Sequence, residues 1–166
     1  MGYRTILFAE NMSLGTGNVL AAFQTAAVNS LAAFVEITRL EISQSGSTTI
    51  GMVRGEIATR DTAGTLTMTS TTPKKVRPLA GPASGLSGNT APAGAAGRSG
   101  TNSSADSGGT YTTVMPFNFA NLNGYLWKPD PSEQILVPPS TLLVVRFLAS
   151  PGTTTGWTIA LHLDEN

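Results

Sequence analysis

The stretch TGWTIALHL (155–163) indicates the fold class, because its apolar and polar residues alternate strictly along the chain. One face of this stretch carries Trp157, Ile159, Leu161 and Leu163, and the other carries Thr158, Ala160 and His162. A period of two with one apolar face is typical of an antiparallel strand that is buried on one side. The stretch therefore predicts a β-strand whose inner face lies in the core of a sheet protein.

Other short stretches upstream have the apolar, β-branched composition of strands. They are RTILFA (4–9), FVEITRLEIS (34–43), TIGMVRGEIATR (49–60), TLTMTS (65–70), TYTTVMPFNF (110–119), GYLWKP (124–129), QILVP (134–138) and TLLVVRFLA (141–149). The last of these is apolar on both faces except at Arg146, which favours a central strand or an interface strand. Turn residues such as DTAG (61–64) and SPGT (150–153) separate the stretches. We predict an all-β fold, an antiparallel β-sandwich or jelly roll of about eight strands.

Two segments carry more detailed predictions. In residues 34–43 the apolar phase slips by one residue near Arg39, which indicates a β-bulge or a change of facing sheet. Residues 17–34 are rich in alanine and fit both a strand, with a turn at 28–30, and an amphipathic helix. The strand is the preferred interpretation of this segment.

A segment rich in Gly, Ala, Ser and Pro, GPASGLSGNTAPAGAAGRSG (81–100), interrupts this pattern. It has few apolar side chains whose burial could offset the conformational entropy lost on ordering. We therefore expect one long loop over residues 81–109. This loop is either a surface excursion or an arm that becomes ordered against another chain. The expected organisation is a single domain, with an N-terminal strand or arm at 1–30 and a β-sandwich at 31–166 that contains the loop.

Composition restricts the classes of function. The chain has 166 residues without a cysteine, and ten basic residues balance ten acidic ones. Cysteine-based metal sites, disulfides and thiol nucleophiles are therefore excluded, and no charge excess favours nucleic acid or an anionic membrane. Only 12% of the residues are charged, about half the usual share, which is common in proteins whose surface contacts partners. No apolar run or leader pattern marks a membrane span or a signal peptide, and we expect synthesis in the cytoplasm.

Residues with catalytic chemistry are sparse. The single histidine, His162, lies on the polar face of its strand, where we expect it to be exposed and without a role. No nucleophile elbow, phosphate-binding loop or calcium loop is present in the sequence. We therefore predict no catalytic residue, no cofactor and no metal site. The basic cluster KKVR (74–77) fits either a solvated connector or a clamp against an acidic surface of a protein partner.

Larger blocks of the sequence carry a resemblance to a known family. The blocks are FVEITRLEISQSG (34–46), MVRGEIATRD (52–61), the insert rich in small residues, and residues 111–165. Within the last block, NGYLWKPDPSEQILVPPSTLLVVRF (123–147) resembles the segment aromatic–Pro–x–Pro–Glu–x–x–I–x–V–x–P that precedes a penultimate strand. Over residues 31–165 the chain is similar to the jelly-roll capsid decoration, or cement, proteins of tailed bacteriophages.

This resemblance implies a structural protein of the virion without enzyme activity. Such a protein is made in the host cytoplasm, binds the outer surface of the head as a homotrimer, and stabilises contacts between major capsid proteins. Its partners would be the major capsid protein and itself, without nucleic acid or membrane. The candidate trimer interface consists of Leu143, Val145, Phe147, Tyr125 and Trp127. The candidate capsid contacts are Lys74, Lys75, Arg77 and Arg98.

Two alternatives remain open from the sequence. A trimeric tail-fibre or receptor-binding tip could use the same sandwich, although no fibrous shaft is visible in this sequence. A carbohydrate-binding module would present Trp127, Trp157 or Tyr125 on an exposed face.

Overall fold

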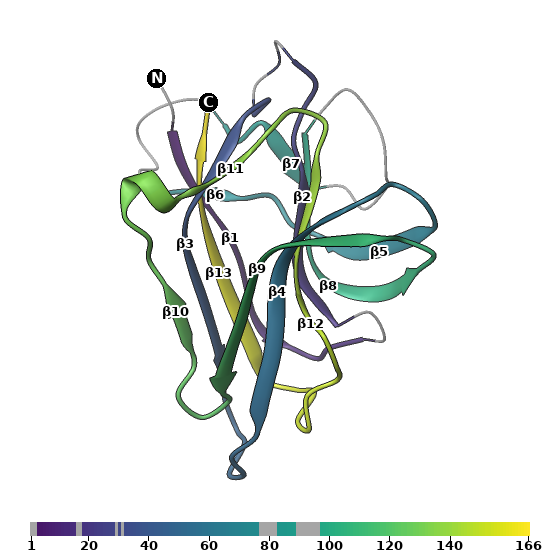
Figure 1. Ribbon diagram of the computed structural model, residues 1–166, viewed down its shortest axis with the longest axis vertical. Coiled ribbons are helices and arrows are strands. Elements are labelled where there is room, and N and C mark those ends of the chain that lie inside the picture. Colours follow the sequence, from purple (N-terminus) through teal and green to yellow (C-terminus); the bar gives the residue numbers. More distant parts are fainter. Residues whose placement is uncertain (1–2, 16–17, 29, 31, 77–82, 89–96) are drawn as a thin grey trace.

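The computed structural model is a sandwich of two β-sheets (Figure 1). It describes residues 3–15, 18–28, 30, 32–76, 83–88 and 97–166. One sheet has the strand order β10-β3-β13-β1-β6, with β11 also paired to β3, and the other has the order β5-β8-β2-β12-β4-β9, with β7 paired to β8. All strand pairs are antiparallel except β7 with β8. The predicted all-β antiparallel sandwich is confirmed, although its described strands are more numerous than the eight or so predicted.

The first sheet, sheet A, has six strands. They are β1 (Tyr3–Met12), β3 (Val35–Gln44), β6 (Lys74–Lys75), β10 (Tyr125–Trp127), β11 (Ile135–Val137) and β13 (Trp157–Glu165). The second sheet, sheet B, has seven: β2 (Val19–Gln24), β4 (Met52–Arg60), β5 (Thr65–Ser70), β7 (Leu86–Gly88), β8 (Gly97–Ser107), β9 (Tyr111–Ala120) and β12 (Leu142–Phe147). A short 3₁₀ helix, η1 (Pro131–Glu133), lies between β10 and β11.

The inner faces of the two sheets form the main core. Trp157, Ile159, Leu161 and Leu163 on β13 are fully buried, as their alternation predicts. They pack with inward side chains of sheet B such as Phe23, Ile57 and Phe147. An aromatic group consisting of Phe117, Phe119, Tyr125, Phe147 and Trp157 closes one end of this core.

A second core explains why β12 is apolar on both faces. Leu143 and Val145 face the main core, whereas Val144 faces outward into a smaller cluster with Leu66 and Met68 of β5. β12 lies between β2 and β4, and β5 covers its outer face because sheet B curls over itself. The sequence prediction of a central strand is therefore correct.

The structure also resolves the ambiguous segments near the N-terminus. The pairing of β3 with β13 shifts by one residue at Thr38, so the predicted bulge near Arg39 is confirmed. Residues 19–24 form strand β2 and no helix. β1 and β2 are interior strands of sheets A and B, respectively. The described part of the predicted N-terminal arm is therefore an integral part of the sandwich.

The predicted loop at 81–109 is wrong over much of its length. Residues 97–107 form the long strand β8, which pairs with both β2 and β5, and residues 86–88 form β7. Small residues suit this position because neighbouring strands approach closely: a Cβ at Gly100 would lie 2.6 Å from Cβ of Met68. The hydroxyls are satisfied as well, since Ser99 Oγ donates to Thr71 O at 2.6 Å. The sequence pattern typical of a loop here encodes a tightly packed strand.

This packing predicts that enlarging Gly100 destabilises the fold. In Gly100→Ala the new methyl group meets Met68 and, at 3.0 Å, the backbone oxygen of Thr69. We expect the free energy of unfolding to fall by about 1–3 kcal/mol, the usual cost of overpacking. Urea unfolding, monitored by tryptophan fluorescence, measures this change in the free energy of unfolding. The matched control is Gly152→Ala, where an added Cβ meets nothing within 4 Å; equal stability of the two variants would contradict this packing.

Candidate functional site

The apolar residues predicted for a trimer interface do not lie on the surface. Leu143, Val145 and Phe147 are buried in the main core of the single chain. They are the inward positions of β12, which has a neighbouring strand on each side. This prediction is wrong, because side chains that already fill the core cannot contact another subunit.

The predicted aromatic interface residues line the rim of the core. Tyr125 and Trp127 are half-buried on β10, and the Tyr125 ring stacks on Phe117 with centroids 4.7 Å apart. Trp157 is fully buried, and its Nε1 donates to Thr153 O at 2.8 Å. Trp157 therefore cannot provide the exposed aromatic platform expected for a carbohydrate-binding module.

Three of the four basic residues predicted to contact a capsid are described by the structure, and they lie on different parts of the fold. Lys74 and Lys75 form β6 at one edge of sheet A, paired with β1. Arg98 belongs to β8 in sheet B. Arg77 lies outside the described residues. The structure thus places Lys74 and Lys75 in one sheet and Arg98 in the other.

His162 lies within an ionic cluster on the outer face of sheet A. Its Nε2 is 3.3 Å from Oε1 of Glu41, which also pairs with Nε of Arg39 at 2.7 Å. Burial lowers the pKa of His162 below its ordinary value, although the hydrogen bond to Glu41 opposes that shift. We predicted that His162 is exposed, but its ring is half-buried between neighbouring strands.

Glu165 is a buried carboxylate that the sequence analysis missed. It continues the inward phase of β13 and is fully buried. Its Oε1 accepts hydrogen bonds from Thr5 Oγ1 at 2.7 Å and Ser84 Oγ at 2.6 Å, and its Oε2 accepts one from Gly85 N at 2.8 Å. The carboxylate thereby attaches the segment before β7 to sheet A.

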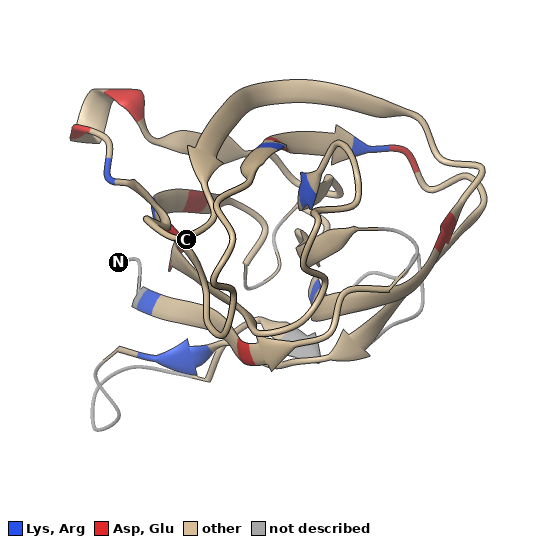
Figure 2. Cartoon of the chain, turned by 90° about the horizontal axis from the view of Figure 1, so that it is seen from below, with Lys and Arg blue, Asp and Glu red and all other residues tan. Residues whose placement is uncertain are grey.

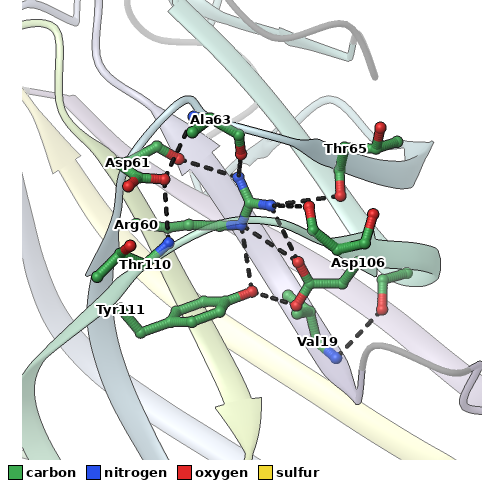
Figure 3. A network of polar contacts seen from close by, with 10 residues as sticks. Val19, Arg60, Asp61, Ala63, Thr65, Asp106, Thr110 and Tyr111 are labelled. Carbon is green, nitrogen blue, oxygen red and sulfur yellow. Dashed lines mark hydrogen bonds and ion pairs between the residues drawn. The ribbon is translucent and has the colours of Figure 1, made fainter.

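A larger polar network surrounds Arg60 where β4 ends (Figure 3). The Arg60 guanidinium is buried and pairs with Oδ1 of Asp106 at 3.1 Å. Its nitrogens also donate to the carbonyl oxygens of Asp61, Ala63, Thr65 and Ser107. Tyr111 accepts from Arg60 Nε at 3.2 Å and donates to Asp106. The network joins the turn after β4 to the turn after β8.

A second ion pair extends the network along sheet B. Arg146 lies 2.7 Å from Oε1 of Glu56, and the other carboxylate oxygen, Oε2, accepts a hydrogen bond from Thr113. The Arg146 guanidinium covers the Tyr111 ring, 3.4 Å from its centroid, in a cation–π contact. These groups neutralise one another within the fold, so we assign them a structural role.

The network predicts a specific loss of stability in alkali. Burial, together with the hydrogen bond to Asp106, raises the pKa of Tyr111 to about 12. The unfolded chain releases this proton near pH 10, so the stabilisation is complete below pH 10 and is lost as pH rises toward 12. We expect the free energy of unfolding of the wild type to fall more steeply over this range than that of Tyr111→Phe. Urea titrations at several pH values measure the free energy of unfolding of both proteins. If the two free energies fell in parallel with pH, Tyr111 would not have the raised pKa assigned to it.

Three loops lie at the end of the sandwich opposite the chain termini (Figure 1). Their residues contribute most of the lining of a cleft. The loop end is defined here as residues 44–52, 120–124 and 148–156. The cleft has a volume of about 300 Å³. Its lining consists of Thr49, Ile50, Gly51, Met52, Val53, Asn121, Pro151, Gly152, Thr153 and Trp157. None of these lining residues carries an acidic or basic side chain.

Hydrogen bonds hold the three loops of the loop end together. Asn121 bridges two of them, since its N donates to Gly51 O at 3.0 Å and its Nδ2 to Thr49 O at 3.1 Å. Ser45 N donates to Gly156 O at 2.9 Å, which joins the first loop to the third. The cleft is therefore a defined feature of the fold.

The three segments of the loop end are uncharged, and exposed apolar side chains stand among their Ser, Thr, Asn and Gly residues. Four large apolar side chains are exposed there: Ile50, Met52, Leu122 and Leu148. Its three segments contain no Asp, Glu, Lys or Arg. Figure 2, which views the molecule from this end, draws these loops in the colour of uncharged residues. The sequence shows that each of the three segments lacks charged residues, but only the fold shows that the three segments lie close together.

Comparisons with protein-family models, curated proteins and solved structures find no match to this chain. Within the described ranges, no group of three or more His, Cys, Asp or Glu side chains is placed to hold a metal ion. The same part of the chain contains no helix long and apolar enough to cross a membrane.

Proposed function

We propose that this chain is a structural protein of a phage virion, a decoration or cement protein. In this proposal it binds the outer surface of the head as a homotrimer and stabilises contacts between major capsid proteins. Three linked copies engage the shell together, which raises the apparent affinity without stronger individual contacts. The protein would be made in the host cytoplasm and would reside on the capsid surface.

The observation that carries this proposal is the loop end. An uncharged surface with exposed aliphatic side chains around a cleft has the chemistry of a protein interface core. The resemblance of residues 31–165 to decoration proteins, and the two-sheet sandwich itself, are consistent with the same function.

The distribution of ionisable groups also favours a binding role over a catalytic one. Arg60, Asp106 and Tyr111 are engaged with one another, and Glu56 pairs with Arg146. The cleft, by contrast, is lined by neutral side chains. We therefore propose that the cleft recognises a protein surface and does not perform acid–base chemistry.

Binding to phage heads tests the proposal. Heads that lack decoration protein are mixed with the purified chain and sedimented, and the bound fraction is measured as its concentration increases. The proposal predicts saturable binding with a copy number that is a multiple of three, and an increase in the temperature at which the heads break. Absence of binding, with heads that rupture at an unchanged temperature, would contradict it.

A further inference from the structure

We infer that residues 84–88 form a strap that can leave the sandwich while the rest of the fold stays intact, and that Glu165 is the latch that holds it. The strap consists of Ser84, Gly85 and strand β7. It lies at the end of the sandwich that holds both chain termini (Figure 1). A movable strap goes beyond the proposed function, because it would open whether or not the chain binds phage heads.

The Glu165 carboxylate joins the strap to sheet A. Glu165 occupies the last inward position of β13 and is fully buried. Two strap residues donate hydrogen bonds to it: Ser84 Oγ to Oε1 at 2.6 Å and Gly85 N to Oε2 at 2.8 Å. Thr5 Oγ1 of β1 donates to Oε1 at 2.7 Å and so fixes the carboxylate within sheet A. The latch is therefore anchored in sheet A, whereas the strand of the strap pairs with sheet B.

Stability alone does not explain a carboxylate at this position. Its three donors are two hydroxyl groups and one backbone amide, all of them neutral. None of the ion pairs between described residues includes Glu165. Burying a carboxylate without an opposite charge is costly, and apolar side chains often replace buried charged groups with little loss of stability. What the carboxylate adds is specific recognition of the hydroxyl and amide donors of the strap.

Few other contacts hold the strap. Its strand β7 pairs with β8 over three residues, Leu86–Gly88, and no second strand in the described part of the chain pairs with it. The pairing is parallel, which is slightly less stable per residue than antiparallel pairing. Among the described side chains of the strap, that of Leu86 alone belongs to the main core. A segment with so few buried apolar contacts opens at a lower free energy than the sandwich as a whole.

The strap nevertheless fits closely against β8. A Cβ at Gly97 would lie 2.8 Å from Gly85 O and 2.9 Å from Cδ2 of Leu86. Ser84 Oγ also accepts a hydrogen bond from Leu86 N at 3.1 Å, which orders the strap itself. Opening therefore separates the strap from β8 and from Glu165 together. Sheet A stays intact in the open form, because β13 keeps its pairing with β1 on one side and β3 on the other.

The test measures amide hydrogen exchange of the full chain by nuclear magnetic resonance. Glu165→Met removes the acceptors of all three hydrogen bonds but keeps an unbranched side chain of similar length. We expect the amides of Gly85 and Leu86 to exchange about tenfold or more faster than in the wild type, because hydrogen bonds to a charged group are lost. The amides of Ile159 and Leu161, in the buried centre of β13, report opening of the whole sandwich. The strap amides should accelerate relative to them.

The matched control is Asp164→Asn, which alters the neighbouring side chain on the outer face of β13 and should leave strap exchange unchanged. Ser84→Ala removes one donor of the strap. It should accelerate the same amides in the wild type but add little to Glu165→Met, because the two residues act as a pair. Glu165→Gln replaces the methionine variant if that variant does not fold. Strap amides that exchange no faster than the core amides of β13 in the Glu165 variant, or that accelerate equally in Asp164→Asn, would overturn the inference.

Discussion

Replacing Arg60 with methionine is expected to lower the free energy of unfolding by about 3–5 kcal/mol, the usual cost of removing one partner of a buried ion pair. The methionine fills part of the space but donates no hydrogen bond. Asp106 is then left as a buried carboxylate whose remaining side-chain donor is Tyr111. Four carbonyl oxygens in the two adjoining turns also lose the guanidinium. Urea unfolding monitored by circular dichroism measures the loss.

The control for this prediction is an ion pair on the surface. Arg4 pairs with Asp164 at 3.2 Å, but its side chain is 70% exposed. Arg4→Met is therefore expected to cost about 0.2–1 kcal/mol. If Arg60→Met is no more destabilising than Arg4→Met, the network around Arg60 does not have the structural role assigned to it.

The second large effect is expected at Trp157. The side chain is fully buried, and it contacts Phe147 and Phe119 edge-on with centroids 4.8 and 6.2 Å away. Trp157→Ala should lower the free energy of unfolding by about 3–5 kcal/mol through lost burial and the cavity that remains. It also frees the carbonyl oxygen of Thr153 in the loop end. Guanidinium unfolding followed by far-ultraviolet circular dichroism measures the change without relying on tryptophan fluorescence.

A conservative variant separates the two contributions of Trp157. Trp157→Phe keeps an aromatic ring in the core but removes the hydrogen bond to Thr153 O. We expect this variant to retain most of the stability that Trp157→Ala loses. A loss smaller than about 1 kcal/mol in Trp157→Ala would contradict the position of this side chain in the core.

Strand positions were predictable because one-sided burial imposes a period of two on the sequence. The alternation in residues 155–163 correctly identified the buried face of β13, and the phase slip near Arg39 correctly marked the bulge in β3. The alternation even continues one step further than predicted, to Glu165, whose burial depends on hydrogen bonds from Thr5 and the Ser84–Gly85 segment. Local pattern alone does not reveal such distant donors.

The errors in the sequence predictions have physical causes as well. Glycine and serine in β8 have the composition of a loop, but they occur there because Met68 and its neighbours leave no space at Gly100. In the sequence, a leucine that faces the core, such as Leu143, gives the same apolar pattern as a leucine in a subunit interface. Only the structure, in which β12 has a paired strand on each side, distinguishes the two cases. The partners Arg60 and Asp106 are far apart in sequence and meet only when sheet B curls.

The molar mass of the purified chain in solution distinguishes the proposed homotrimer from a monomer. Multi-angle light scattering on the wild-type protein alone, over a range of concentrations, gives this mass without reference to a partner. A homotrimer gives a stable species near three times the chain mass of 17.2 kDa, and this is the expected result. A species that stays at 17.2 kDa at every concentration would contradict the homotrimer.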